Sequence, residues 1–391
     1  MKSMEIDAEA LADFVLRLIG TESLSGHEGG VAQLVESEMR QLGMNVEIDE
    51  LGNVLGSLDA GDGPCILLDS HMDTVGVNNP SDWSHDPRGE RTGDRIYGRG
   101  SMDMKGPLAA SIFGVALLKA NLRHGRVVVS ASVAEELVEG PAAERVARRI
   151  MPDYAIVCEA TSLRLAIGQR GRAEIMINVR GRSTHSSRPE LGVNAADIMA
   201  DIIVSLRGLR APSHPVLGEG ILVLTDVMSQ PYPGLSVVPD DCTATFDRRT
   251  LPNETESQIL EPIRDVISSV LQRAGASGGA AIAVDEFRTY RGALIKAPNF
   301  APAWYVPAET RFVAAAARGL VESGLNAELC HYAFCTNGSG TAGRLAIPTL
   351  GFGPGDEQMA HRVDEYIELA QLVAAAKGYA AIVNGWLEGR L

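Results

Sequence analysis

A histidine flanked by two aspartates comes directly after a short apolar run. Residues 66–68 (Ile-Leu-Leu) lead into Asp69-Ser70-His71-Met72-Asp73. An imidazole at the end of a buried strand suits a metal ion, and a carboxylate two residues later can orient the ring and raise its basicity. Taken alone, such a histidine is more often an ordinary hydrogen-bonded residue. His71 and Asp73 therefore need support from elsewhere in the chain.

Three acidic residues have a comparable setting. Asp103 lies in the glycine-rich loop 98–106, which enters a helix. It could bridge two cations, or it could cap the helix and interact with its dipole. Glu135 and Glu136 follow the predicted strand 126–132. Adjacent carboxylates repel each other unless a cation or solvent relieves them, so one could bind a metal while the other acts as a general base. A solvated acidic turn is the commoner alternative.

Two further candidates complete the set. Glu159 follows the predicted strand 154–158, and His361 follows a glycine-rich turn and an acidic loop. Each signal is modest by itself, but all the candidates fall at the carboxyl ends of strands, where α/β sheets bind their ligands. We therefore expect His71, Asp103, Glu136, Glu159 and His361 to hold two divalent ions. These donors suit Zn²⁺, and Co²⁺ or Mn²⁺ would fit the same set.

The elements that must position these side chains predict an α/β fold. Short apolar strands alternate with helices up to residue 168 and again after residue 298, which predicts a mostly parallel, buried sheet. Between them the order changes to βαββαβ, the pattern of a ferredoxin-like unit. We expect a discontinuous catalytic, metal-binding domain of residues 1–168 and 298–391, and an inserted domain of residues 169–297.

The inserted domain is predicted in more detail. We expect strands at 172–180, 221–228, 241–248 and 281–289, and helices at 194–209 and 256–274. Thr255 and Gln258 form a possible capping box for the second helix. Pro262 offers an alternative start for that helix, because proline is well tolerated in a first turn.

The composition of the chain indicates which partners are excluded and which cellular compartment is expected. The chain has 391 residues and a formal net charge of −15. This acidity argues against nucleic-acid or anionic-membrane partners, since both require basic patches. Its five cysteines are widely spaced and include no CxxC pair, so a disulfide framework is not expected. Without a signal-peptide pattern at the N-terminus, we expect a cytoplasmic protein.

Five segments resemble the M20 metallopeptidases, the group of acetylornithine deacetylase, succinyl-diaminopimelate desuccinylase and carboxypeptidase G. They are SHMDTV (70–75), GRGSMDMKG (98–106), AEE (134–136), CEAT (158–161) and PGDEQMAHRVDE (354–365). The resemblance implies that His71 and Glu159 bind one ion, that Glu136 and His361 bind the other, and that Asp103 bridges them. It makes Asp73 the orienting carboxylate and Glu135 the general base. The overall character is most similar to the branch of selenium-metabolism hydrolases.

The resemblance also implies substrate contacts and a dimer. His185 would donate to the carbonyl oxyanion in the partner subunit's site, and Arg249 would clamp a substrate carboxylate. Arg248 lies on the opposite strand face, so only one of the two arginines can point into the site. Asn337 and Gly338, in TNGSGTAGRLAIP (336–348), would contact substrate as well. The inserted domain would act as a lid and as the surface of a homodimer.

Two departures from the family pattern limit what can be transferred. Ser236 stands where asparagine is usual before Val237-Val238-Pro239, and Ala160 replaces a proline after Glu159. The ligands survive both changes, but substrate contacts near Ser236 do not transfer.

We therefore expect a two-metal hydrolase that cleaves the amide bond of an N-acyl amino acid or short peptide, with Glu135 moving the proton. A dipeptidase, or a catabolic hydrolase of a modified amide, is a second interpretation. A non-catalytic binding protein on the same fold is a third, and it would be favoured by a missing ligand or base. None is missing from this sequence.

Overall fold

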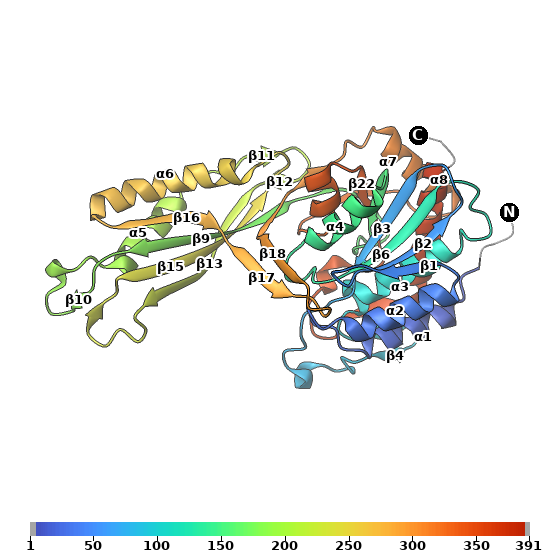
Figure 1. The fold of residues 1–391 in the computed structure, drawn as a ribbon, viewed down its shortest axis with the longest axis horizontal. Coiled ribbons are helices and arrows are strands. Elements are labelled where there is room, and N and C mark those ends of the chain that lie inside the picture. Colours follow the sequence, from blue (N-terminus) through green and yellow to red (C-terminus); the bar gives the residue numbers. More distant parts are fainter. Residues whose placement is uncertain (1–4, 388–391) are drawn as a thin grey trace. The chain divides into compact units, whose positions relative to one another are not determined.

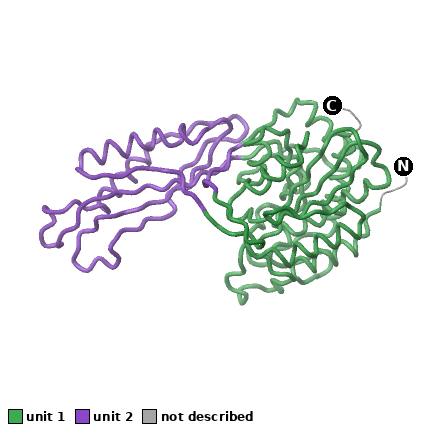
Figure 2. The backbone as a smooth tube through the Cα atoms, in the orientation of Figure 1, with its two compact units in different colours: residues 1–169, 286–296, 304–391 green, residues 170–285, 297–303 purple. Residues whose placement is uncertain are grey.

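The computed structural model describes residues 5–387 and contains two compact units (Figure 2). Unit 1 comprises residues up to Gln169, Glu286–Lys296 and residues from Trp304 onward. Unit 2 comprises Arg170–Asp285 and Ala297–Ala303. The fold class is the expected one, an α/β unit interrupted by a smaller α+β unit.

Unit 1 is built on a nine-stranded sheet (Figure 1). Its order is β1-β2-β6-β3-β7-β22-β8-β20, and β21 also pairs with β8. The strands β6, β3, β7 and β22 are neighbours in that order and run parallel to one another. The bounds are β1 Asn45–Ile48, β2 Val54–Asp59, β3 Cys65–His71, β6 Arg126–Ser132, β7 Tyr154–Val157, β8 Leu165–Gln169, β20 Trp304–Tyr305, β21 Leu329–Tyr332 and β22 Thr349–Gly351.

Helices cover this sheet because its central strands are apolar on both faces. Val146 and Ile150 of α4 pack against Leu67 of β3 and Val128 of β6. Side chains alternate along a strand, so Leu68, buried like Leu67, faces the opposite side of the sheet. The helices of unit 1 are α1 Ala8–Ile19, α2 Gly29–Gln41, α3 Gly106–Ala116, α4 Pro141–Ile150, α7 Arg311–Glu322 and α8 Leu369–Leu387.

A small three-stranded sheet, β23-β5-β4, lies beside the glycine-rich loop of unit 1. Its strands are β4 Glu90–Thr92, β5 Arg95–Tyr97 and β23 Tyr366–Glu368. Pairing of Tyr366 with Tyr97 brings the residues just before β23 next to the residues just after β5.

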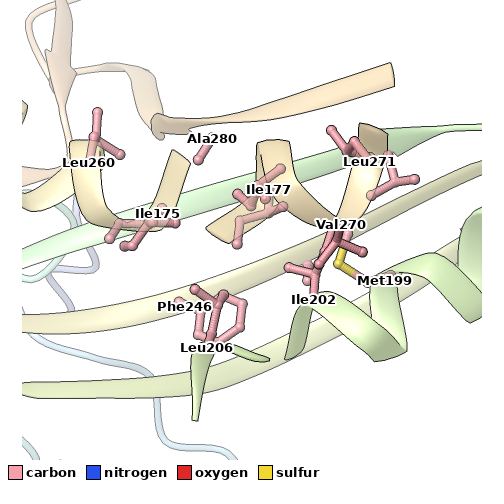
Figure 3. Close-up of a cluster of buried hydrophobic side chains, with 14 of the residues drawn as sticks. Ile175, Ile177, Met199, Ile202, Leu206, Phe246, Leu260, Val270, Leu271 and Ala280 are labelled. Atoms are coloured by element: carbon pink, nitrogen blue, oxygen red, sulfur yellow. The ribbon is translucent and has the colours of Figure 1, made fainter. Parts of the chain in front are cut away.

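Unit 2 has the βαββαβ order that the sequence predicts. Its strands β9 Gly171–Arg180, β13 Ile221–Gln230, β15 Asp241–Thr250 and β16 Ser277–Ile282 form an antiparallel sheet in the order β13-β15-β9-β16. Helices α5 Ala195–Leu206 and α6 Glu256–Ala274 supply the other half of the core. Figure 3 shows Ile175 and Ile177 of β9 beside Leu260 and Met199 from the helices. Alternate residues of β9 are buried, as expected for a strand with one covered face.

The second helix of unit 2 settles an alternative left open by the sequence. Thr255 accepts a hydrogen bond from the Gln258 backbone N–H, and the Gln258 side chain accepts one from Thr255, so the capping box is present. Pro262 lies inside α6 and does not start it.

The end of unit 2 differs from expectation. The strand predicted at 281–289 is divided between β16 and β17 (Val284–Arg288), and β17 forms a hairpin with β18 (Leu294–Pro298). Residues 286–296 belong to unit 1, because the Tyr290 hydroxyl donates to the Gly52 carbonyl oxygen at 2.9 Å. A Cβ on Gly52 would lie 2.3 Å from the Tyr290 ring, so this contact requires glycine there. The boundary at residue 297 was therefore too simple, and β19 (Phe300–Ala301) returns to pair with β9.

The structure bears on two expectations from composition, those about disulfides and about membranes. All five cysteines are free. Within residues 5–387, none of the helices is both long enough and apolar enough to cross a membrane.

Candidate metal centre

The parallel strands of unit 1 bring the predicted ligands together at one edge of the sheet. His71 ends β3 and pairs in register with Ser132, the last residue of β6. Glu135 and Glu136 come directly after β6, and Glu159 comes after β7, which is the other neighbour of β3. Parallel strands all point their carboxyl ends to the same side, so chain segments far apart in sequence converge there.

Asp103 lies between two imidazoles. Its Oδ1 is 3.2 Å from Nε2 of His71, and its Oδ2 is 3.3 Å from Nε2 of His361. Glu159 Oε1 approaches the same His71 nitrogen at 3.4 Å, whereas Glu136 Oε2 approaches the His361 nitrogen at 3.1 Å. The cluster thus has two halves that share one carboxylate.

Glu135 lies beside the His71 half of this arrangement, close enough to His71 and Glu159 that these three side chains could also hold an ion. Its Oε2 is 3.8 Å from Nε2 of His71, farther than the oxygens of Asp103 and Glu159. The side chain is buried. Burial raises the pKa of Glu135 well above its ordinary value; His71 opposes this shift, and the charge of Glu159 adds to it.

The remaining carboxylates of the cluster are also affected by burial. Burial is the largest cause of the raised pKa of Glu136 and of Glu159. Burial acts in the same direction on Asp103, but hydrogen bonds with His361 and His71 prevail and lower its pKa below the ordinary value. Among the described residues, no lysine or arginine forms an ion pair with any of these three carboxylates. Within residues 5–387, the side chains that contact them and can carry a positive charge are His71 and His361.

The pKa values of both imidazoles are raised as well. Hydrogen bonds with Asp103 and Glu136 raise the pKa of His361 to about 10. Burial lowers the pKa of His71, but hydrogen bonds with Asp103, Asp73 and Glu159 leave it well above the ordinary value. Protons and metal ions compete for the same donor atoms, so metal binding at such donors releases protons.

The hydrogen bonding of His71 provides a direct test of whether a cation fits. Its Nδ1 lies 2.9 Å from the carbonyl oxygen of Asp73, which can only accept, so Nδ1 carries a hydrogen. In the neutral ring Nε2 then has a lone pair, and this lone pair faces the oxygens of Asp103 and Glu159. Such an arrangement is repulsive unless a proton or a cation lies between the atoms. The imidazole and carboxylate donors are those that zinc-type ions prefer.

Asp73 orients this ring mainly through its backbone. Its carboxylate Oδ1 is 3.4 Å from Nδ1 of His71, farther than its carbonyl oxygen. The two carboxylate oxygens instead accept the backbone N–H groups of Glu135 and Glu136, both at 3.1 Å, and the Ser25 hydroxyl at 2.6 Å. Asp73 therefore holds the acidic turn against the histidine strand.

Asn337 is buried beneath the same turn. Its amide nitrogen donates to Asp69 Oδ2 at 2.8 Å and to Ser132 Oγ at 2.9 Å, and its oxygen accepts the Gly140 N–H at 2.9 Å. These bonds tie β3, β6 and the segment after Glu136 together. With the amide engaged in this way, the structure gives Asn337 a scaffolding role, and a substrate contact stays a prediction.

Gly338 also packs closely. A Cβ at this position would lie 2.5 Å from Nε1 of Trp304 and 3.1 Å from Oε1 of Gln169. Glycine is therefore required here by neighbouring side chains. Its backbone N–H donates to Oγ1 of Thr336 at 3.0 Å.

The other two predicted substrate contacts lie in unit 2. His185 is in β10 (Thr184–His185), and its Nδ1 accepts the backbone N–H of Ser187 at 3.1 Å. Arg248 is buried and donates to Glu254 at 2.8 Å, whereas Arg249 is half-buried and pairs with Asp247 at 2.8 Å. Of the two arginine side chains, that of Arg249 is the more exposed, at 29% against 7% for Arg248.

Sequence reasoning missed three buried carboxylates near the centre, Glu28, Asp69 and Glu365. Glu28 accepts the backbone N–H groups of Gly26 and Ala134, both at 3.0 Å, and so fixes the residue before the Glu135–Glu136 pair. Nothing near Glu28 in the sequence signals this, since its partner is more than a hundred residues away. Asp69 had a signal, because a carboxylate inside an apolar strand needs a buried partner.

Comparisons with known proteins agree on one family. Residues 67–385 match the model of peptidase family M20/M25/M40. The Escherichia coli K12 protein YgeY is 33% identical over 385 residues, covering 96% of this chain and 94% of YgeY. An acetylornithine deacetylase of Proteus mirabilis is 27% identical over 394 residues, covering 94% of each chain. The crystal structure of aminopeptidase PepT from Bacillus cereus superimposes with a TM-score of 0.75 at 21% identity, covering 97% of this chain and 99% of PepT.

The scaffolding role of Asn337 can be tested by truncation. Asn337→Ala removes both donors to Asp69 and Ser132 and the acceptor of the Gly140 N–H, so buried polar groups lose their partners. We expect the free energy of unfolding to fall by about 1–3 kcal/mol or more, measured by urea denaturation of the metal-free protein. Asn326→Ala, at an exposed position, is the control and should change stability little. Wild-type stability for Asn337→Ala would contradict the assigned role.

Proposed function

Because the chain belongs to peptidase family M20/M25/M40, we propose that it is a two-metal hydrolase of the amide bond in an N-acyl amino acid or a short peptide. Family membership makes it a metal-dependent hydrolase. The observation that carries the two-metal proposal is the position of Asp103, whose two oxygens approach different imidazoles.

The residues divide naturally into two half-sites. His71 and Glu159 would hold one ion, His361 and Glu136 the other, and Asp103 both. The ion is proposed to be Zn²⁺, with Co²⁺ or Mn²⁺ compatible with the same donors. Ions bound there would supply Lewis acidity, which polarises an amide carbonyl and lowers the pKa of water.

Glu135 is proposed as the general base. It lies farther from His71 Nε2 than Asp103 and Glu159 do, and the Asp73 carboxylate fixes its backbone. Its carboxylate would take the proton from the attacking water and pass it to the departing amine nitrogen. Burial favours the protonated state between these steps.

Unit 2 is proposed to supply the substrate contacts. Since Nδ1 of His185 accepts a hydrogen bond, Nε2 carries the hydrogen in the neutral ring and can donate to a developing oxyanion. Arg249, whose side chain is more exposed than that of Arg248, is the proposed clamp for a substrate carboxylate. A carboxylate clamp fits an N-acyl amino acid, the type of substrate named for the acetylornithine deacetylase relative. A peptide substrate is the second candidate.

The cytoplasm is proposed as the compartment. All five cysteines are free, and three of them are buried, which suits a reducing environment.

A homodimer through unit 2 is proposed as well. β13 is an edge strand, since it pairs only with β15 in the order β13-β15-β9-β16. Exposed apolar side chains lie along it: Val223 (49% exposed), Val227 (46%) and Met228 (56%). An apolar edge strand with free backbone groups is a surface that another chain can pair with.

The substrate proposal is tested by a hydrolysis screen. Metal-stripped and zinc-restored protein would be assayed with N-acetyl, N-succinyl and N-formyl amino acids and with dipeptides, following release of amine. We expect turnover of at least one class by the restored protein alone. Absence of amide hydrolysis by protein with bound metal would contradict the proposal.

Glu135→Gln provides the matched variant in that screen. It keeps the size of the side chain but cannot take a proton, so activity should fall by about 10²-fold or more. Metal content, measured by atomic emission, should stay at the wild-type value. Loss of metal together with activity would show that Glu135 is a ligand and not the base.

The dimer is tested by light scattering after size-exclusion chromatography. Wild type should have twice the chain mass of 41.6 kDa. Val227→Lys places a charge on the exposed edge of β13 and should shift the protein to a single chain mass. Val321→Lys, at an equally apolar exposed position on α7, is the control and should leave the mass unchanged. A dimer that survives Val227→Lys would place the interface elsewhere.

A further inference from the structure

Glu365, like Asp73, is a buried carboxylate that accepts backbone N–H groups. It holds the backbone of Asp103, the proposed shared ligand. Glu365 precedes β23, four residues after His361, and its side chain is 0% exposed. It belongs to neither half-site. Nothing in the proposed reaction uses it, although it ends one of the segments that carry the family resemblance.

The contacts of Glu365 all lie in the glycine-rich loop 98–106. Oε1 accepts the backbone N–H of Met102 at 2.9 Å and that of Asp103 at 3.1 Å. Oε2 accepts from Nη1 of Arg99 at 2.6 Å. The backbone carbonyl of Glu365 accepts the N–H of Gly98 at 2.9 Å. Glu365 therefore holds the loop both at its first residue, Gly98, and at the proposed ligand, Asp103.

The same hydrogen-bond pattern occurs at the turn that carries Glu135 and Glu136. Asp73 accepts the adjacent N–H groups of Glu135 and Glu136, just as Glu365 accepts those of Met102 and Asp103. In each case a buried carboxylate grips two consecutive peptide groups, and the second of them carries a proposed ligand. Charge-assisted bonds of this kind are among the stronger hydrogen bonds in proteins.

We infer that Glu365 is a positioning residue for Asp103, and that it sets the affinity of the centre for its ions by fixing where the two oxygens of Asp103 point. This inference rests on the proposed function, because it assumes that Asp103 is the shared ligand. Without the grip of Glu365, the peptide of Asp103 could rotate and its carboxylate could no longer serve both halves equally.

The chemistry of the contacts predicts a graded response to substitution. Glu365→Gln keeps an oxygen that can accept both N–H groups, but its amide –NH₂ would face the donor Nη1 of Arg99. Glu365→Ala removes the acceptor altogether and leaves two buried N–H groups and one guanidinium without their partner. Removal of groups that orient a metal ligand commonly weakens metal binding by about 10–100-fold.

The experiment is a Zn²⁺ titration of metal-free protein in competition with a chromophoric chelator. Wild type should bind two Zn²⁺ per chain. We expect the affinity for Zn²⁺ to fall by about tenfold in Glu365→Gln and by about 100-fold in Glu365→Ala. Thermal unfolding of each metal-free variant shows that the titrated protein is folded, and Glu365→Gln carries the test if Glu365→Ala does not fold.

Glu368→Gln is the matched control. Glu368 lies three residues further on, is partly exposed and pairs with Arg95 at 3.3 Å, so its variant should titrate like wild type. Wild-type Zn²⁺ affinity in folded Glu365→Gln, with only a lowered unfolding temperature, would overturn the inference and leave the proposed function intact. Failure of wild type itself to bind two Zn²⁺ would overturn both.

Discussion

The proposed catalytic site of unit 1 depends on the repulsion among buried carboxylates at the end of its central strands. Asp103, Glu135, Glu136 and Glu159 converge there, and in the described residues 5–387 only imidazoles offset their charge by direct contact. Such a cluster is costly to bury unless cations occupy it. The sheet provides the site because its parallel central strands β6, β3, β7 and β22 end on the same side.

Three buried carboxylates outside the proposed ligand set hold the backbone beside that cluster. Asp73, Glu28 and Glu365 each accept consecutive or nearby N–H groups of a turn that carries a site residue. The side-chain oxygen of Asn337 accepts the Gly140 N–H and so holds the segment that follows Glu136. This shell explains how side chains on separate loops are kept within hydrogen-bonding distance of one another, which metal sites require for both affinity and activity.

The sequence predicted the fold class, the order of elements in the insertion and the proximity of the candidate residues, because each had a local signal. That these residues bind metal stays a prediction. Alternating apolar runs marked β9, and apolar runs followed by acidic residues or histidine marked β3 and β7. The hairpin around Tyr290 was misassigned because its affiliation depends on a contact with Gly52, far away in the chain. The shell residues Glu28 and Glu365 escaped for the same reason, since their partners lie across long sequence distances. Asp73 was predicted to orient His71 through its carboxylate. Its carbonyl oxygen, not the carboxylate, makes the shorter contact with the His71 ring.

The claim that most needs a direct measurement is that Asp103 joins two metal ions. Electron paramagnetic resonance of the protein loaded with two equivalents of Mn²⁺ would test it without reference to any substrate. Ions bridged by a shared carboxylate lie close enough for their spins to couple, so the account predicts the spectrum of an exchange-coupled pair. A spectrum of isolated, non-interacting Mn²⁺ ions at full occupancy would contradict it.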